Sequence, residues 1–213
     1  MIVLENITYQ YPGAKVPVIR QLSAEFPSAA ITAITGPNGC GKTTLSKLLV
    51  GILRPGAGRI SVDGTDIAPL DLFQIGQKVG YLFQNPEHQL FCETVYKEIA
   101  YGLNNLGFPP DKTAQTVEQY LQWFHLEALR ADFPGNLSRG EKQRVALSAV
   151  LSMGTRYLIL DEPTTGLDLR SRRQLGALLV QIRDQMSCGI LLISHERQFI
   201  NTYADREWVM PCV

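Results

Sequence analysis

The chain has 213 residues, enough for one large domain with a buried core. Its content of 45% hydrophobic and 19% charged residues is ordinary for a globular protein. Twenty basic and twenty acidic residues give a formal net charge of zero, which excludes a general electrostatic attraction to nucleic acid. We therefore expect no nucleic-acid partner, although a local basic patch would escape this argument.

The cysteines and the apolar stretches exclude further classes of protein. The four cysteines are scattered and form no CxxC pair: Cys40, Cys92, Cys188 and Cys212. This spacing predicts neither a zinc site nor a disulfide scaffold. The longest apolar stretches, near Tyr157–Leu160 and Ile190–Ile193, are far shorter than the roughly twenty residues that span a bilayer. We expect any membrane role to be peripheral, through a partner.

Three β-type runs open the chain, at Ile2–Tyr9, Ile19–Phe26 and Ala30–Thr35. The third is apolar enough to be a central strand buried on both faces. A glycine-rich loop follows it, and Thr43–Gly51 then carries leucines at helical spacing. The glycines and proline of RPGAGRISVDG, residues 54–64, predict a hairpin-like region.

The chain changes character after Lys78–Phe83, which predicts another buried strand. Apolar residues then recur at helical spacing in two groups: Val95, Ile99, Leu103 and Leu106, and then Val117, Leu121 and Phe124. The Gly107–Pro110 segment separates the groups, and Asp111 is a candidate N-cap of the second helix. We expect a mostly helical insertion from Asn85 to about Pro134.

Alternation of strands and helices then returns. Tyr157–Leu160 and Gly189–Ser194 predict buried strands, and the final ADREWVMPCV predicts a last one. The helix between the two buried strands is predicted by Leu175, Leu178, Leu179, Ile182 and Met186. The coarse expectation is one nucleotide-binding α/β unit with a helical lobe.

The segment Gly36–Thr44, GPNGCGKTT, follows a strand and opens a helix, which is the context of a phosphate-binding P-loop. Its glycines let the backbone N–H groups face the phosphates, and the helix dipole adds positive potential. Lys42 is placed to neutralise β- and γ-phosphates, and Thr43 offers a hydroxyl to Mg²⁺. The predicted nucleotide-binding residues of this loop are Gly36, Asn38, Gly39, Cys40, Gly41, Lys42, Thr43 and Thr44.

Two carboxylates, Asp161 and Glu162, come at the end of the apolar strand Tyr157–Leu160. Adjacent strand residues point to opposite sides, so the two acids should have different tasks. We expect Asp161 to hold the Mg²⁺ shell and Glu162 to polarise or position the attacking water as a general base. A salt-bridging surface pair is the alternative, which the preceding P-loop disfavours.

Ser138 and Glu141, in LSRGEKQRVALSAVL, have the spacing of a capping box at the start of a predicted helix over Gly140–Met153. A capped helix start that exposes the Ser138 hydroxyl and the Gly140 amide is also an anion site suited to a γ-phosphate. Capping and phosphate binding are compatible roles.

With this segment included, the chain resembles the ATP-binding-cassette (ABC) ATPases over essentially its whole length. The resemblance implies an α/β P-loop NTPase with a RecA-like core, an N-terminal antiparallel β subdomain and a helical subdomain. It implies one domain over 1–213, with the β subdomain and P-loop core in 1–84 and 155–213 and the helical subdomain in about 85–154. ATP and Mg²⁺ are the implied cofactors.

Further residues match the motifs of that family. Tyr11 matches an aromatic that stacks on adenine, Gln84 a glutamine that touches Mg²⁺ and water, and His195 a histidine that contacts the γ-phosphate. Asp168 matches the loop that crosses the dimer, and it is also a good N-cap. Taken alone, Tyr11 could be an edge-strand aromatic and His195 a surface histidine. The implied catalytic residues are Glu162, Gln84 and His195, and the implied Mg²⁺ residues are Thr43, Gln84 and, in the outer coordination shell, Asp161.

In the family, the signature segment acts on the nucleotide of the opposite subunit. The corresponding residues are Ser138, Arg139, Gly140 and Glu141. The resemblance thus implies a second ABC ATPase subunit, in a homodimer or a heterodimer. Arg139 and Glu141 depart from the usual LSGGQ. Arg139 could lend positive charge near the nucleotide or crowd a place that needs a small residue, and we favour a working but altered site.

The segment QNPEHQLFCETVYKEIAYGLNNLG resembles the ATPases of energy-coupling-factor importers and their cobalt and nickel relatives. This implies an ATPase at the cytoplasmic face of the membrane, docked on a transmembrane coupling protein. That protein works with a substrate-binding membrane protein to import a vitamin or transition-metal ion. Leu90, Phe91 and Val95 are expected to be exposed and to line a groove for a partner helix, or else to pack the lobe's own core.

The alternatives are an exporter or lipoprotein-release ABC subunit and, less favoured, a non-transport ABC ATPase. Importer ATPases usually continue well beyond the histidine strand, whereas this chain ends soon after His195. We therefore expect either a compact variant or an excised part of a longer protein.

Overall fold

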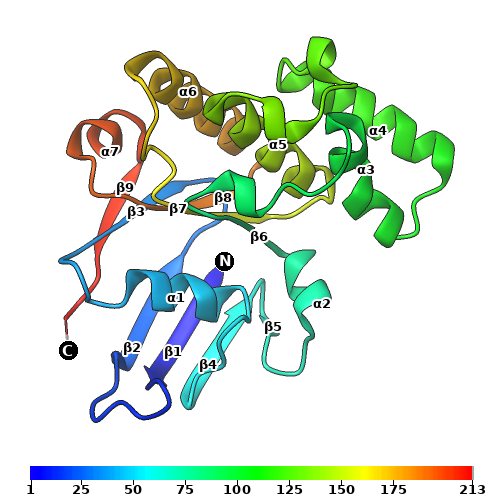
Figure 1. Ribbon diagram of the computed structural model, residues 1–213. Helices are drawn as coiled ribbons and strands as arrows, with labels where there is room; N and C mark the ends of the chain where they lie inside the picture. The colour runs from blue at the N-terminus through cyan, green and yellow to red at the C-terminus, as the bar shows by residue number, and fades with distance from the viewer. Residues whose placement is uncertain (213) are drawn as a thin grey trace.

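The computed structural model describes residues 1–212, which form three layers (Figure 1). A four-stranded sheet lies on one side, a five-stranded parallel sheet lies in the middle, and most of the helices cover the other side. Helix α1 (Lys42–Leu49) lies between the two sheets, where its leucines are buried. Within residues 1–212, no helix combines the length and apolar character needed to cross a bilayer.

The outer sheet is antiparallel and has the order β2-β1-β4-β5. Strands β1 (Ile2–Tyr9) and β2 (Ile19–Phe26) coincide with two of the predicted runs. Strand β4 (Ala57–Val62) pairs with the short β5 (Thr65–Asp66), so the hairpin predicted for this region is confirmed. Its two-residue turn is Asp63–Gly64, both with positive φ, the conformation that the Asp-Gly pair favours.

The central sheet is parallel and has the order β6-β7-β8-β3-β9. Its strands are β3 (Ile31–Thr35), β6 (Val79–Leu82), β7 (Tyr157–Asp161), β8 (Gly189–Ile193) and β9 (Arg206–Val209). Every residue of β3, β7 and β8 is buried, as expected for strands covered on both faces. Because parallel strands end at the same edge, the loops after them meet there.

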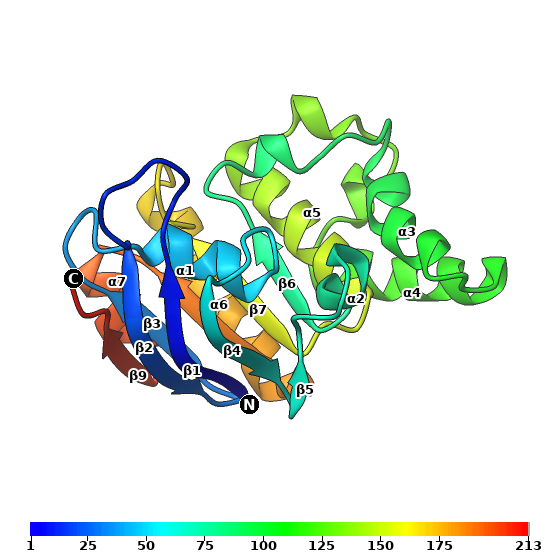
Figure 2. The same ribbon diagram turned by 90° about the horizontal axis from the view of Figure 1, so that it is seen from below.

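The chain between β6 and β7 is mostly helical, as predicted. It contains α3 (Val95–Asn105), α4 (Pro110–Trp123) and α5 (Arg139–Ser152), and three short 3₁₀ turns: Pro86–His88, Glu127–Leu129 and Pro134–Asn136. Figure 2 shows these helices displaced to one side of the sheets. Helix α6 (Leu169–Met186), which follows β7, packs against β3 and β8.

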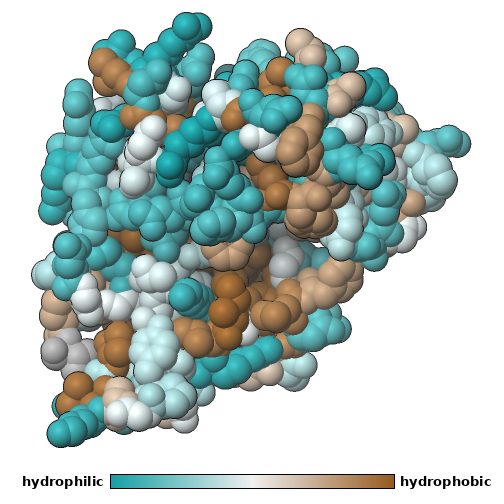
Figure 3. Space-filling model, in the orientation of Figure 1, coloured by the Kyte–Doolittle hydropathy of each residue, from teal (hydrophilic) through white to brown (hydrophobic). Residues whose placement is uncertain are grey.

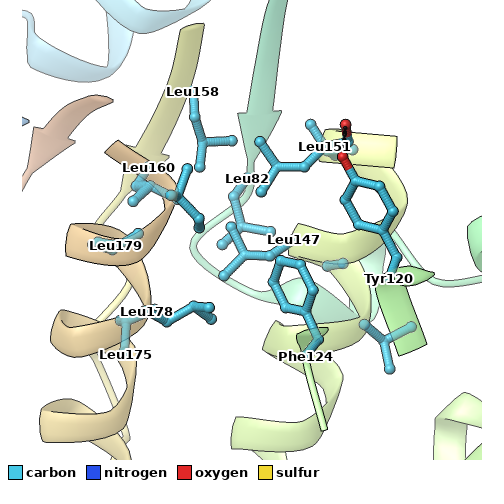
Figure 4. Close-up of a cluster of buried hydrophobic side chains, with 14 of the residues drawn as sticks. Leu82, Tyr120, Phe124, Leu147, Leu151, Leu158, Leu160, Leu175, Leu178 and Leu179 are labelled. Atoms are coloured by element: carbon cyan, nitrogen blue, oxygen red, sulfur yellow. Dashed lines mark hydrogen bonds between the residues drawn. The ribbon is translucent and has the colours of Figure 1, made fainter. Parts of the chain in front are cut away.

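The two faces of the central sheet belong to two different cores. Along β7, Leu158 and Leu160 pack among the helices, beside side chains of α4, α5 and α6 (Figure 4). Tyr157 and Ile159 pack on the opposite face, with the leucines of α1 and the inner residues of the antiparallel sheet. This alternation follows from the two-residue period of a strand. The short strand β7 therefore packs against the helical layer on one face and against α1 and the antiparallel sheet on the other.

Some expectations for local structure were wrong. Asp111 does not cap α4: Pro109 is the N-cap residue and Pro110 is the first helical residue. Proline is well suited to that position because its missing N–H would have no partner there, and Asp111 instead lies in the first turn, where its charge complements the helix dipole. Of the two alternatives for Leu90, Phe91 and Val95, an exposed groove or the lobe's own core, the core holds for the fully buried Val95 and the partly buried Leu90, whereas Phe91 is 64% exposed.

Two short helices were not predicted, α2 (Leu72–Gly76) and α7 (Arg197–Tyr203). Both are too short to show a helical repeat in the sequence. A capping box starts α2, in which Asp71 and Gln74 bond each other's backbone N–H. The three-residue spacing of Asp71 and Gln74 is the feature of the sequence that could have predicted the start of α2.

Candidate functional site

A cavity of about 500 Å³ opens at the carboxyl ends of the central strands, beside the first turn of α1. Most of the predicted site residues line it: Tyr11, Asn38, Gly39, Gly41, Lys42, Thr43, Thr44, Gln84, Asp161, Glu162 and His195. Val18 and Ile193 complete the wall. Residues that are far apart in the sequence are thus brought together by the loop between β1 and β2 and by the loops after β3, β6, β7 and β8.

The loop after β3 wraps around the side chain of Lys42. The Lys42 ammonium is buried and donates to the carbonyls of Gly36, at 2.9 Å, and Pro37, at 3.0 Å. Gly41 is the N-cap of α1 with a φ of 100°, a conformation that favours glycine, and it offers no side-chain acceptor to the first-turn amides. The helix start therefore presents backbone N–H groups and a positive dipole end to the cavity.

Cys40 was predicted among the nucleotide-binding residues but does not line the cavity. Its thiol is buried beneath Gly36, where an added Cβ would lie 3.0 Å from the Cys40 sulfur and 3.2 Å from the Met210 carbonyl oxygen. Gly36, at a φ of 144°, also lies outside the lining. Cys40 and Gly36 thus pack against each other outside the cavity lining and support the phosphate loop.

Asp161 ends β7 and is buried. The hydroxyl of Tyr81, on the neighbouring strand β6, donates to the Asp161 carboxylate at 3.1 Å and lies 3.3 Å from the hydroxyl of Ser46 in α1. Burial raises the pKa of Tyr81 to about 12, so this phenol remains a donor at neutral pH. Sequence reasoning missed Tyr81, and the available signal was a side chain with a polar tip within an apolar strand.

Glu162 turns away from the strand in a left-handed conformation with a φ of 49°. Its N–H bonds the carbonyl of Ile193 at 2.9 Å, and its carbonyl accepts from Thr165 at 3.2 Å, so this strained turn is fixed at both ends. The carboxylate lies 3.3 Å from Nε2 of His195. Burial raises the pKa of Glu162, while the neighbouring His195 opposes that rise.

Tyr11 and Gln84 border the same cavity. The Tyr11 hydroxyl lies 3.1 Å from Oγ1 of Thr44, and its ring meets Tyr9 edge-on at 5.0 Å. The carbonyl of Gln84 accepts a hydrogen bond from Arg139 at 3.1 Å. The acids, the lysine and the two threonines thus form one polar cluster with an aromatic ring at its margin.

The remaining predicted residues lie outside this cavity. At the start of α5 the expected capping box is confirmed: Glu141 accepts from the Ser138 N–H at 2.9 Å and from its hydroxyl at 2.6 Å, while the Glu141 N–H donates back to that hydroxyl oxygen. These bonds, the hydroxyl first, hold the pKa of Glu141 below its usual value. Asp168 caps α6 as expected, accepting from Ser171 at 2.6 Å. Gly140 contributes to a second cavity, of about 440 Å³, between α5 and α6.

A glycine-rich loop that wraps a buried lysine, two acids at the end of the neighbouring strand and a parallel central sheet define a P-loop nucleoside triphosphatase. The chain belongs to the ABC transporter family, because a family model described as "ABC transporter" matches residues 19–165. Its fold is that of an ABC ATPase domain.

Similar proteins include the ATP-binding protein of an energy-coupling factor transporter and a component of an ABC transporter complex. The chain is 37% identical to an energy-coupling factor transporter ATP-binding protein, EcfA, of Methanothermobacter thermautotrophicus, over 99% of this chain and 68% of that protein. It superposes on cbiO1 of Clostridium perfringens, part of the ABC transporter complex cbiONQ, with a TM-score of 0.91 and 32% identity, covering 98% and 84% of the two chains. It spans only 34% of a Methanosarcina acetivorans ABC transporter ATP-binding protein at 37% identity.

Proposed function

We propose that this chain is the ATP-binding and ATP-hydrolysing subunit of an ABC-type importer that takes up a vitamin or transition-metal ion through a separate transmembrane partner. The observation that carries the ATPase proposal is the meeting of Lys42, Asp161 and Glu162 at one cavity beside the start of α1. The similarity to EcfA and cbiO1 supports the importer type. We propose that residues 85–154 act as the helical subdomain of a single ATPase domain.

The residues of the cavity fit a nucleotide with its magnesium ion. Thr43, Gln84 and Asp161 offer hydroxyl, amide and carboxylate oxygens, the ligand types that Mg²⁺ prefers, with Asp161 in the outer shell. A bound Mg²⁺ would neutralise charge on the β- and γ-phosphates. Tyr11 would stack on the adenine, while Lys42 and the α1 amides would hold the phosphates.

Glu162 is proposed as the general base for the attacking water. Burial makes its carboxylate a stronger proton acceptor than a free glutamate, which suits that task. His195 lies 3.3 Å from the Glu162 carboxylate and would hold a γ-phosphate oxygen. It would thereby keep the γ-phosphate close to the Glu162 carboxylate. Gln84, which lines the same cavity, would help to position the attacking water.

A second ATPase subunit is proposed to complete each site. Ser138, Arg139, Gly140 and Glu141 lie at the start of α5, outside the cavity that holds Lys42 and Glu162. A capped helix start suits a γ-phosphate that another copy or a paralogue presents. Asp168, at the start of α6, would contribute to the same contact.

A membrane partner is proposed to bind the face that Figure 3 shows. Apolar side chains gather there between the lower layer and the helices above. Large hydrophobic side chains on α2, on the segment after β6 and on α3 are exposed: Leu72, Phe73, Phe83, Phe91 and Tyr101. The Phe91 and Tyr101 rings meet edge-on at 4.8 Å, so part of this apolar surface is preformed. Docking there would hold the ATPase at the cytoplasmic face of the membrane.

The test of the ATPase proposal compares the wild type with Glu162→Gln and, as a matched control, the exposed Glu127→Gln. We expect MgATP hydrolysis by the wild type and the control, and a loss of about 10²- to 10⁴-fold in Glu162→Gln. Light scattering should then show an ATP-dependent dimer of Glu162→Gln. Full activity in Glu162→Gln would refute the role of this carboxylate.

The importer assignment needs a different experiment. The chain is purified from membranes with a tag, and the co-purifying transmembrane proteins are identified. A coupling protein together with a small substrate-binding membrane protein supports the proposal. Recovery with an exporter or a lipoprotein-release permease would favour the alternative.

A further inference from the structure

One face of α5 contacts two loops that border the cavity: the loop after β6, which carries Gln84, and the turn after β7, which carries Glu162. Arg139, Lys142 and Gln143 are spaced i, i+3 and i+4 and therefore lie on the same side of the helix. That side faces the loop after β6, which begins near Gln84, and the turn after β7, which contains Glu162. The start of α5 is thus connected to the cavity within a single chain.

The loop after β6 is attached to α5 at two points. Nη2 of Arg139 donates to the main-chain carbonyl of Gln84 at 3.1 Å. Three residues further along the loop, Glu87 pairs with Lys142 at 2.6 Å, and the Lys142 side chain is only 10% exposed. The Lys142 ammonium holds the pKa of Glu87 below its usual value, so this ion pair is formed at neutral pH.

The turn after β7 is attached to the same helix face. Nε2 of Gln143 donates to the carbonyl of Pro163 at 2.9 Å, in a buried position. The Arg139 guanidinium packs on Gly166, where an added Cβ would lie 3.0 Å from Nη1 and 3.1 Å from Cζ of Arg139. Gly166 has a φ of 73°, so its lack of a side chain serves both the turn and this close approach. Arg139 therefore touches both loops at once.

We propose that Arg139 is a positioning residue that clamps the loops carrying Gln84 and Glu162 to the start of α5 in its own subunit. The resemblance to LSGGQ sequences places a glycine here, and glycine has no side chain with which to make this contact. The planar guanidinium has five donors in a fixed fork, which suits a bond to a carbonyl combined with packing on a flat turn. The inference rests on the proposed ATPase function and adds a contact within one subunit that orders its site.

The clamp predicts a particular kinetic signature. Arg139 fixes the main chain of Gln84 and the turn after Glu162, whereas Lys42 is held by the phosphate-loop carbonyl of Gly36 and Tyr11 lies beside Thr44. The loss of Arg139 should therefore lower kcat, roughly three- to tenfold, and leave the affinity for ATP nearly unchanged. Arg139→Lys retains a donor without the fork, so it should restore part of the lost kcat.

The decisive measurement is hydrogen exchange of the ATP-free protein, compared between wild type, Arg139→Met and the exposed control Arg173→Met. We expect peptides covering residues 83–90 and 162–168 to exchange at least about threefold faster in Arg139→Met, with the phosphate loop unchanged. The control should match the wild type. Unchanged exchange in both peptides would overturn the proposal, because a clamp within the subunit must act without nucleotide or partner.

The kinetic outcomes separate this proposal from its rivals. A changed ATP affinity or a lost ATP-driven dimer, with loop exchange unchanged, would assign Arg139 to the neighbouring subunit's nucleotide and overturn the clamp. A rise in turnover of about tenfold in Arg139→Gly would show a side chain that obstructs the site, which also overturns it. A wild-type protein that hydrolyses no ATP would refute the proposed function, while the exchange data would still decide on the clamp.

Discussion

Replacing Tyr81 with phenylalanine tests the connection between β6 and the acid at the end of β7. The substitution removes the hydroxyl that donates to Asp161 at 3.1 Å and leaves the ring in place. Ser46 keeps its other hydrogen bond, to the carbonyl of Thr43 at 2.9 Å. The perturbation is therefore one lost donor to a buried carboxylate, without a cavity.

The expected magnitude follows from the burial of that carboxylate. A hydrogen bond to a charged group contributes about 1.5–3 kcal/mol to the free energy of unfolding. Asp161 is only 8% exposed, so water replaces the lost donor poorly and the loss should lie within this range. For a chain of this size, 1 kcal/mol corresponds to roughly 2–4 °C in Tm, and Tyr81→Phe should melt about 3–12 °C below the wild type.

The assay is thermal and urea unfolding of ATP-free protein, monitored by circular dichroism. Tyr101→Phe is the matched control, because it deletes a phenolic hydroxyl from a residue that is 48% exposed. The control should unfold as the wild type does. If Tyr81→Phe also unfolds as the wild type does, the hydroxyl does not stabilise Asp161 and the reasoning fails.

Three further predictions concern the capped helix and the carboxylate of Glu162. Ser138→Ala should lower the free energy of unfolding by about 1 kcal/mol in urea titrations. Because Ser138 lowers the pKa of Glu141, that difference should shrink as the pH falls through the folded-state pKa, and a difference that grows in acid would contradict it. Burial raises the pKa of Glu162, so ionising this carboxylate lowers the free energy of unfolding at pH values above the usual glutamate pKa. ATP-free Glu162→Gln should therefore have a higher free energy of unfolding than the wild type at neutral pH, and the same free energy in acid. In His195→Ala the pKa of Glu162 should rise further, moving the acid limb of the residual kcat/KM profile to higher pH; an unmoved limb would assign it to another group.

Features that depend on local sequence were predictable. The apolar runs of β3, β7 and β8 indicated strands buried on both faces, because only such strands lack polar alternation. The Ser138–Glu141 spacing predicted a capping box, since both partners lie within one helical turn. The P-loop residues and the two acids were predicted from motifs whose chemistry fixes both residue type and order, and the structure places most of them around one cavity.

Features that depend on contacts between distant segments were not predictable. The bond between Tyr81 and Asp161 joins neighbouring strands that are separated in the sequence by the whole helical insertion. The bond between Arg139 and the Gln84 carbonyl of the same chain likewise joins segments 55 residues apart, and no local pattern predicts it. The helical period of Val95 was equally consistent with an exposed groove and with the core, and the residue lies in the core. Helical periodicity shows which residues share a face but not what that face packs against.

The burial of the Cys40 thiol behind the phosphate loop makes this cysteine a built-in reporter of loop opening. An alkylating reagent can reach the sulfur only when the loop over Gly36 moves away, so the labelling rate measures how often that happens. Burial raises the pKa of Cys188 to about 12, and that thiol should remain inert. With the exposed Cys212 replaced by serine, and with Cys92 followed separately by mass spectrometry, the alkylation kinetics at Cys40 would report the opening of the loop without an engineered cysteine.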